Sequence, residues 1–210
     1  MRELATVLCA LLLFAWLALA SRGPAAPAFD LGIREAVHSA ASAPLTGLMK
    51  TVTNLGSGWF LWALGLGVAL WLESAGRRRD AAWFAVTVLG ANLLNEAMKL
   101  GFHRRRPEAY FGYPLPVTYS FPSGHSFVSF CFYMTLAEIL IRSHWPRWYK
   151  AVIVAIAVML TLTIGMSRIY LGVHYPSDVA GGYAAAIAWT ILVRATNRRW
   201  WRRRAPAPQA

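Results

Sequence analysis

Three short segments of this sequence bring together residue types that bind anions and transfer protons. The first contains Lys99 and Arg106, the second is the tetrapeptide at residues 122–125, and the third covers residues 167–178. Each segment lies beside an apolar stretch that is long enough to cross a membrane. Ionisable side chains are costly at such places and commonly functional, so the three segments form one candidate site.

Three cations in these segments are suited to binding a phosphate group: Lys99, Arg106 and Arg168. Two of them carry a planar guanidinium, whose N–H groups can bind two oxygens of one phosphate. An arginine at the end of a membrane span also commonly extends its charge to lipid head groups. We keep that interpretation for Arg104 and Arg105, with an auxiliary electrostatic role as the alternative.

The tetrapeptide at residues 122–125, with the sequence PSGH, is typical of a helix start that binds an anion. Proline is tolerated in the first helical turn, and glycine lets a ligand come close to the backbone. The free N–H groups of such a terminus attract anions. Ser123 and Gly124 are therefore candidate phosphate ligands, through a hydroxyl and a backbone N–H, and plain helix capping is the alternative.

His174 and Asp178 are four residues apart, so on a helical turn their side chains share a face. A carboxylate on one ring nitrogen fixes the tautomer and leaves the other nitrogen free to act as a nucleophile. A single histidine at a membrane edge is more often structural or solvated. A second histidine, His125, one carboxylate and three cations on one face favour a catalytic site.

The composition indicates a membrane protein. Of the 210 residues, 57 % are hydrophobic and 14 % are charged, whereas a typical soluble domain has about 25 % charged residues. The net charge of +12 comes largely from arginines at the edges of the apolar stretches, which suits an anionic membrane surface better than nucleic acid. Cys9 and Cys131 are expected to be packing residues. No spacing typical of a metal site is present, and we expect neither a metal nor another cofactor.

Six apolar stretches predict an all-α, polytopic membrane protein with a six-helix transmembrane bundle and the active site at one membrane face. A spanning helix needs about 17–25 residues, and isolated strands are excluded because a backbone in lipid must satisfy its own hydrogen bonds. The predicted spans are Leu4–Ala20, Gly56–Leu72, Ala81–Leu100, Ser123–Ile141, Ala151–Met166 and Val179–Arg194.

The order of these spans places the three candidate segments on the same side of the membrane. Only a loop separates the first segment from the second, and two spans separate the second from the third. Most of the 21 lysines and arginines fall on the opposite side, which the positive-inside rule makes cytoplasmic. We therefore expect a multi-pass protein of a bacterial inner membrane, with both termini in the cytoplasm and the site on the outer, periplasmic side.

Three regions are expected along the chain. Residues 1–55 hold the first span, or a signal-like segment that ends near Ala20, and an outer connection that is either a plain linker or a short interfacial helix. Phe29, Leu31, Ile33, Ala36 and Val37 would form the apolar face of that helix. Residues 56–194 form a five-span core, and residues 195–210 form a basic cytoplasmic tail.

The candidate segments resemble the three signature motifs of the type 2 phosphatidic acid phosphatase superfamily. Six residues separate Lys99 from Arg106-Pro107, as the first motif asks. Residues 122–125 match the second motif, and Ser167-Arg168, His174 and Asp178 match the third without departure. The resemblance covers about residues 56–194, while the N-terminal segment and the arginine-rich tail carry no motif.

This resemblance implies metal-independent hydrolysis of a lipid phosphate or diphosphate. By resemblance, His174 would attack phosphorus and become a phosphohistidine, Asp178 would orient it, and His125 would protonate the leaving oxygen and then activate water. The residues expected to hold the phosphoryl oxygens are Lys99, Arg106, Ser123, Gly124 and Arg168.

A site within the membrane favours a lipid substrate, with undecaprenyl diphosphate expected first and phosphatidylglycerophosphate or phosphatidic acid next. Two other functions stay open at the level of sequence. One is a vanadate-dependent haloperoxidase, because those enzymes belong to the same superfamily. The other is a transporter or lipid-binding protein, in which Asn92, Asn95 and Glu96 would line a pathway instead of supporting the site. The sequence does not indicate an oligomeric state.

Overall fold

The structure, a computed structural model, describes residues 1–23 and 25–203, with only the backbone for residues 199–203. Over this part of the chain it contains α-helices and no β-strand, which confirms the all-α prediction. The helices are α1 (Arg2–Ala20), α2 (Ala28–Ser39), α3 (Ala43–Asn54), α4 (Gly58–Ser74), α5 (Arg78–Phe102), α6 (Gly124–Ile141), α7 (Arg147–Tyr170) and α8 (Pro176–Arg203).

Each predicted span coincides with one long helix, namely α1, α4, α5, α6, α7 or α8. By length and hydropathy, α1, α6, α7 and α8 can each cross a membrane, and α3 with α4 can form a fifth span that is bent by 48°. The remaining helix, α5, carries Asn92, Asn95, Glu96 and Lys99 in its C-terminal half, which makes it less apolar. The chain is therefore a multi-pass membrane protein, and the predicted count of six spans is approximate.

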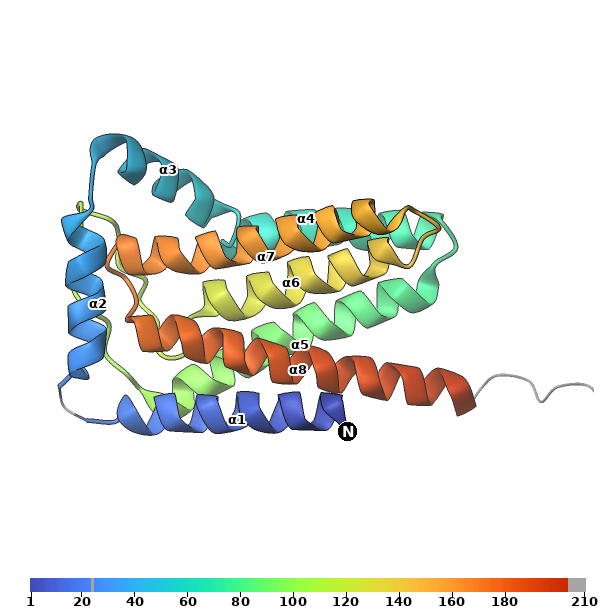
Figure 1. Ribbon diagram of the computed structural model, residues 1–210, viewed down its shortest axis with the longest axis horizontal. Coiled ribbons are helices and arrows are strands. Elements are labelled where there is room, and N and C mark those ends of the chain that lie inside the picture. Colours follow the sequence, from blue (N-terminus) through green and yellow to red (C-terminus); the bar gives the residue numbers. More distant parts are fainter. Residues whose placement is uncertain (24, 204–210) are drawn as a thin grey trace, which may run out of the picture.

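The long helices run side by side along the long axis of the molecule, and α1 lies along α8 (Figure 1). The main core lies between α4, α5, α6 and α8 and includes Phe84 and Phe132, whose rings pack edge to face at 5.0 Å. Small residues let the helices approach. A Cβ added at Gly182 of α8 would lie 2.8 Å from the carbonyl oxygen of Ser123 at the start of α6. This close packing fixes the two helix starts relative to each other.

The connection after α1 contains two helices, and α2 crosses the end of the bundle (Figure 1). A helix, one of the two predictions for this connection, is present, and part of its predicted apolar face lies away from the protein. Leu31 and Ile33 are exposed, whereas Asp30 and Arg34 are buried. The polar face of α2 is thus the one that contacts the rest of the chain.

The predicted basic tail, residues 195–210, is only partly described, because residues 204–210 lie outside the described residues. Where the tail is described, α8 continues through it to Arg203 without a break, so the helix is longer than the apolar stretch that predicted it. Arg194 and Arg198 pair with Glu3 of α1 at 3.1 Å and 2.5 Å. These pairs tie α8 to the start of the chain.

Candidate active site

The three candidate segments meet at one end of the bundle, the end that α2 covers (Figure 1). Lys99 lies in the last turns of α5, residues 122–125 form the start of α6, and Arg168 lies in the last turn of α7. His174 lies in the short turn between α7 and α8. The candidate active site is therefore formed by helix ends that are far apart in the sequence.

The turn that carries His174 is pinned to the loop between α5 and α6. Gly172 has a φ of +76°, which favours glycine, and a Cβ there would lie 2.7 Å from the backbone nitrogen of Tyr110. That nitrogen donates to the carbonyl oxygen of Leu171 at 2.9 Å. Arg34 of α2 donates to the carbonyl oxygen of Glu108 in the same loop at 2.8 Å. The position of His174 thus depends on α2 and on the loop as well as on its neighbours in sequence.

The two ring nitrogens of His174 have different partners. Nδ1 lies 3.2 Å from Oδ2 of Asp178, and Nε2 lies 2.9 Å from Nη1 of Arg106. A guanidinium only donates, so Nε2 is the acceptor in this pair and Nδ1 carries the proton that faces the carboxylate. The arrangement leaves a lone pair on Nε2 that points toward the cations.

His174 is buried, with 2 % of its surface exposed. Burial, with a smaller contribution from the charges of Arg106 and Arg168, lowers the pKa of its imidazole to about 3, although the hydrogen bond to Asp178 opposes this shift. The ring is therefore neutral at physiological pH, which is the form that can act as a nucleophile.

Arg106 is held by backbone carbonyl groups on both sides of the site. Its Nε donates to the oxygen of Thr118 at 2.7 Å, and Nη1 donates to the oxygen of Val173 at 2.9 Å. Burial and the nearby charge of Arg168 lower its pKa to about 10, so the guanidinium keeps its charge at neutral pH. Its contact with His174 therefore belongs to a fixed cation.

Lys99 and Arg168 are buried cations with few anionic partners. Lys99 Nζ donates to Thr118 Oγ1 at 3.2 Å and lies 3.6 Å from Glu96 Oε1. Arg168 is 2 % exposed, and its Nη1 donates to Thr53 Oγ1 at 2.7 Å. A buried cation that hydroxyl groups satisfy only in part favours an anionic ligand beside it.

Ser123 caps α6, because its Oγ accepts from the backbone nitrogen of Ser126 at 3.4 Å. Its oxygen therefore caps the helix as an acceptor, and the hydroxyl proton can still be donated to a ligand. A Cβ at Gly124 would lie 2.9 Å from Asn95 Nδ2 of α5, so glycine is needed where the two helices meet. Asn95 is buried against this helix start, which favours support of the site over a transport pathway.

His125, in the first turn of α6, is half-buried and lies within electrostatic range of Arg168, His174 and Lys99. Its ring forms no hydrogen bond with any described part of the chain. A Cβ added at Gly56 would lie 3.2 Å from its Cδ2. The imidazole therefore packs beside the α3–α4 break and keeps its nitrogens available for a ligand.

For Arg104, the prediction of extension to lipid head groups was wrong, and the alternative, an electrostatic role, agrees with its ion pairs. Its guanidinium is buried, with Nη1 at 2.5 Å from Asp178 Oδ1 and Nη2 at 2.8 Å from Asp30 Oδ2. It faces inward because two buried carboxylates each need a cation, and an unpaired charge would be costly there. Arg105 is exposed, so extension to lipid head groups remains the prediction for that residue.

Three other residues that the sequence did not single out support Asp178. Ser120 Oγ donates to Asp178 Oδ2 at 2.5 Å, and the Ser177 hydroxyl and backbone nitrogen donate to Asp30 at 2.6 and 2.8 Å. One signal for Asp30 was available in the sequence, since it is an acidic residue between the apolar Phe29 and Leu31. Nothing marked Ser120 or Ser177, because serine is common in loops.

No group of three His, Cys, Asp or Glu side chains among the described residues is placed to hold a metal ion. The groups that can balance the charge of a bound phosphate are the cations Lys99, Arg106 and Arg168. A neutral imidazole with its lone pair directed at three cations can attack phosphorus while its developing charge is balanced by a carboxylate.

Several known proteins with similar sequences are phosphatases. The family model described as the PAP2 superfamily matches residues 80–202. The chain is 30 % identical to phosphatidylglycerophosphatase B of Bacillus subtilis over 74 % of this chain and 76 % of that protein. It is 31 % identical to the lipid A 1-phosphatase of Rhizobium johnstonii over 75 % of this chain and 69 % of that protein.

A solved structure has the same fold. It is the crystal structure of a transmembrane PAP2 type phosphatidylglycerolphosphate phosphatase from Bacillus subtilis, with a TM-score of 0.84 and 28 % identity. The match covers 92 % of this chain and 96 % of that one. The fold is therefore shared with that enzyme over most of the chain.

Proposed function

This chain belongs to the PAP2 superfamily and is a membrane phosphatase, and from the geometry around His174 we propose that it hydrolyses the terminal phosphate of a membrane lipid through a phosphohistidine intermediate. The observation that carries the proposal is the contact between Nε2 of His174 and Nη1 of Arg106 at 2.9 Å. It joins a nucleophilic lone pair to a phosphate-binding cation.

In the first step, Nε2 of His174 forms a bond to phosphorus and the bond from phosphorus to the lipid oxygen breaks. His125 gives its proton to that oxygen, so the lipid leaves as a neutral alcohol, or as a shorter phosphate if the substrate is a diphosphate. The phosphorylated ring is positive, and Asp178 balances this charge through Nδ1–H. The hydrogen bond that Arg106 donates to Nε2 is replaced by one to a phosphoryl oxygen.

In the second step, water attacks the phosphohistidine, and His125 accepts a proton from that water. The bond between phosphorus and nitrogen breaks, inorganic phosphate leaves, and His174 returns to its neutral form. Lys99, Arg106 and Arg168 stabilise the charge on the phosphoryl oxygens in both transition states, together with Ser123 and the backbone N–H of Gly124.

We place a glycerophospholipid phosphate first among the substrates and undecaprenyl diphosphate second. The support for this order is the similarity to phosphatidylglycerophosphatase B. The site would open on the outer, periplasmic side of a bacterial inner membrane, because most of the lysines and arginines outside the site fall at the other end of the predicted spans.

The decisive test is to trap the intermediate. His174→Ala should lower phosphate release by about 10³-fold or more while the protein stays folded in detergent. His125→Ala, given a phosphate ester with a good leaving group and a radioactive phosphoryl group, should accumulate label on His174, since only the second step then needs His125. Near-normal turnover by His174→Ala, or label on another residue, contradicts the mechanism.

The substrate is tested separately on the unmodified protein with EDTA present. The panel should compare phosphatidylglycerophosphate, undecaprenyl diphosphate, phosphatidic acid and a water-soluble ester. We expect the long-chain lipids to be preferred in kcat/KM. Equal rates for the soluble ester would contradict a lipid substrate without affecting the phosphohistidine.

A further inference from the structure

A threonine outside the three motifs joins the two cations of the first motif. Oγ1 of Thr118, in the loop between α5 and α6, lies 3.2 Å from Nζ of Lys99 and 3.1 Å from Nη2 of Arg106. Lysine and arginine side chains only donate, so the threonine oxygen accepts both hydrogen bonds. A hydroxyl oxygen has two lone pairs and one proton. Both lone pairs are therefore in use, and the proton of Thr118 is left to donate elsewhere.

This hydroxyl proton has no acceptor within the part of the chain that the structure describes. Thr118 is exposed, so a ligand can reach this side of the loop. Hydrogen bonds from two charged donors polarise the hydroxyl and strengthen it as a donor. An anion bound between Lys99 and Arg106 would lie beside the proton, because one oxygen contacts both cations.

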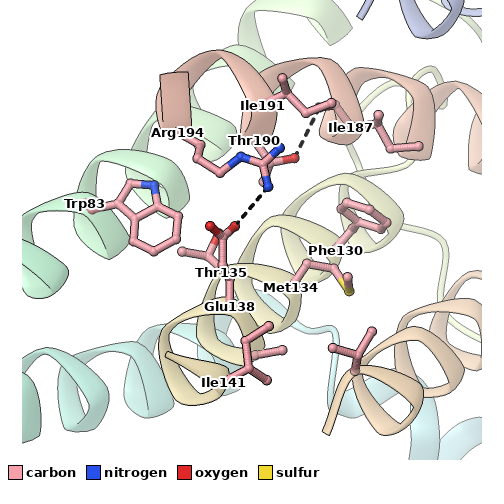
Figure 2. Close-up of a pocket in the computed structure, with 12 residues that line it drawn as sticks. Trp83, Phe130, Met134, Thr135, Glu138, Ile141, Ile187, Thr190, Ile191 and Arg194 are labelled. Carbon is pink, nitrogen blue, oxygen red and sulfur yellow. Dashed lines mark hydrogen bonds and ion pairs between the residues drawn. The ribbon is translucent and has the colours of Figure 1, made fainter. Parts of the chain in front are cut away.

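An arginine at the other end of the bundle is paired differently. Arg194 of α8 lines a mainly apolar cavity of about 430 Å³ there, and Figure 2 shows it extending toward Glu138 on α6. The two side chains form an ion pair at 3.5 Å. Arg106 forms no ion pair with a described carboxylate, and Glu96, which lies 3.6 Å from Lys99, is 58 % exposed and screened by solvent. The neutral hydroxyl thus holds both cations and leaves their charge available to an anion.

We propose that Thr118 is a further phosphate ligand, whose hydroxyl donates to a phosphoryl oxygen held between Lys99 and Arg106. This inference rests on the proposed function, which assigns those two cations to the phosphate. The backbone keeps the loop in place without the hydroxyl. The carbonyl oxygen of Thr118 accepts from Nε of Arg106 at 2.7 Å, and that of Tyr119 accepts from Nη2 at 3.1 Å. A substitution at Thr118 therefore removes the hydroxyl while the loop stays bound to Arg106.

The experiment measures the Kd of inorganic phosphate for the purified full-length protein by isothermal titration calorimetry. Thr118→Val keeps the shape of the side chain and removes the hydroxyl, so Kd should rise about three- to tenfold. Thr118→Ala should behave in the same way, and Thr118→Ser, which keeps the hydroxyl, should restore binding. Thr6→Val is the matched control at the other end of the bundle. Thr6 is exposed and its hydroxyl donates to the carbonyl oxygen of Arg2 at 3.1 Å, so Kd should not change.

A double variant separates a contact with phosphate from an effect through the cation. Arg106→Lys keeps the positive charge but removes the guanidinium that bonds to Thr118. If the hydroxyl binds phosphate itself, Thr118→Val should still raise Kd by about threefold or more in the Arg106→Lys protein. An effect of Thr118→Val that disappears in this background would show that the threonine only holds the arginine, and would overturn the proposal.

The outcomes for Thr118 and for the proposed function can be told apart. An unchanged Kd in both Thr118→Val and Thr118→Ala would overturn the role of the hydroxyl and leave the phosphohistidine mechanism intact. Near-normal turnover by His174→Ala would contradict that mechanism, although phosphate binding could still depend on Thr118. A lack of saturable phosphate binding by the unmodified protein would overturn both.

Discussion

Asp178 is the residue on which most interactions of the candidate active site converge. It is fully buried and accepts from His174, Ser120, the backbone nitrogen of Tyr175 and Arg104. Arg104 in turn holds Asp30 of α2. A carboxylate buried in this way keeps its charge only while its cation stays in place. In the proposed mechanism, Arg104 would therefore act through Asp178, as a positioning residue.

Arg104→Gln should lower kcat by about 10- to 100-fold with little change in KM, because the guanidinium orients Asp178 and does not reach the phosphate. Arg106→Gln should instead raise KM as well. Arg105→Gln is the matched control, since Arg105 is exposed beside it, and it should behave like the unmodified enzyme. Steady-state kinetics with a lipid phosphate checks all three. A change confined to KM in Arg104→Gln would argue for direct phosphate binding.

His174 should stay neutral in mildly acidic solution. Its pKa is lowered to about 3 by burial, whereas an ordinary histidine has a pKa near 6.5 and is mostly protonated at about pH 5. Because the shift is downward, the neutral form persists above about pH 3 in the free enzyme. Nitrogen NMR of histidine-labelled protein, with the His174→Ala spectrum to assign the signal, should show a neutral ring at about pH 5. A signal that titrates near pH 6.5 would contradict this.

The motif residues could be found in the sequence because their spacing is local. The inward position of Arg104 could not be predicted in this way. His174 and Asp178 are one helical turn apart, and residues 122–125 are contiguous. Arg104 is distinguished from Arg105 only by two carboxylates that lie far from it in the sequence. No local pattern records which of two adjacent arginines turns inward, since that depends on how α2 packs against the bundle.

At the scale of elements, the junction of α6 and α8 determines where the proposed catalytic groups lie. The backbone nitrogen of Ser123 donates to the carbonyl oxygen of Asp178 at 2.9 Å. Gly182 lies one turn further along α8, where a side chain would collide with the backbone of α6. The starts of the two helices are thus in direct contact, and the distance between the phosphate-binding and nucleophilic groups follows from that contact.

Gly182→Ala should therefore separate the two helices and lower both stability and activity. Overpacking of this kind costs about 1–3 kcal/mol, which corresponds to a fall of about 5 °C in Tm for a chain of this size. Gly67→Ala in α4 is the control, because nothing lies within 4 Å of a Cβ there, and its Tm should be unchanged or slightly higher. Thermal unfolding in detergent measures both. An unchanged Tm and kcat for Gly182→Ala would contradict the argument.

The helices were predictable from apolar runs, but their ends and the role of α2 were not. The structure extends α5 to residues 78–102, beyond the predicted 81–100, because polar first and last turns remain helical where ion pairs and neighbouring helices stabilise them. In α2 the apolar residues predicted the face of an interfacial helix, and nothing in the sequence predicted the face that packs on the protein. The opposite face is buried because Asp30 and Arg34 find partners in distant segments. The sequence of the helix itself does not indicate which distant residues its polar side chains will contact.

For the whole molecule, the positive-inside argument predicts that the His174 end faces outward. Val117→Cys, an exposed position in the loop beside the site, should react with an impermeant maleimide in intact cells. His144→Cys, an exposed position between α6 and α7, should react only after permeabilisation. The background is measured on the unmodified chain, which has Cys9 and Cys131 within helices. The reverse labelling pattern would place the site in the cytoplasm.

In the proposed mechanism, the contact between Arg106 and His174 also affects which ligands can react. The lone pair that would attack phosphorus accepts a hydrogen bond from the guanidinium, so a substrate has to compete with that hydrogen bond. An incoming phosphate offers anionic oxygens to the same N–H and releases the ring nitrogen as it docks. An uncharged electrophile has nothing to exchange for that hydrogen bond. We therefore expect the imidazole to react with anionic electrophiles, which can take over the hydrogen bond from Arg106, and not with uncharged ones.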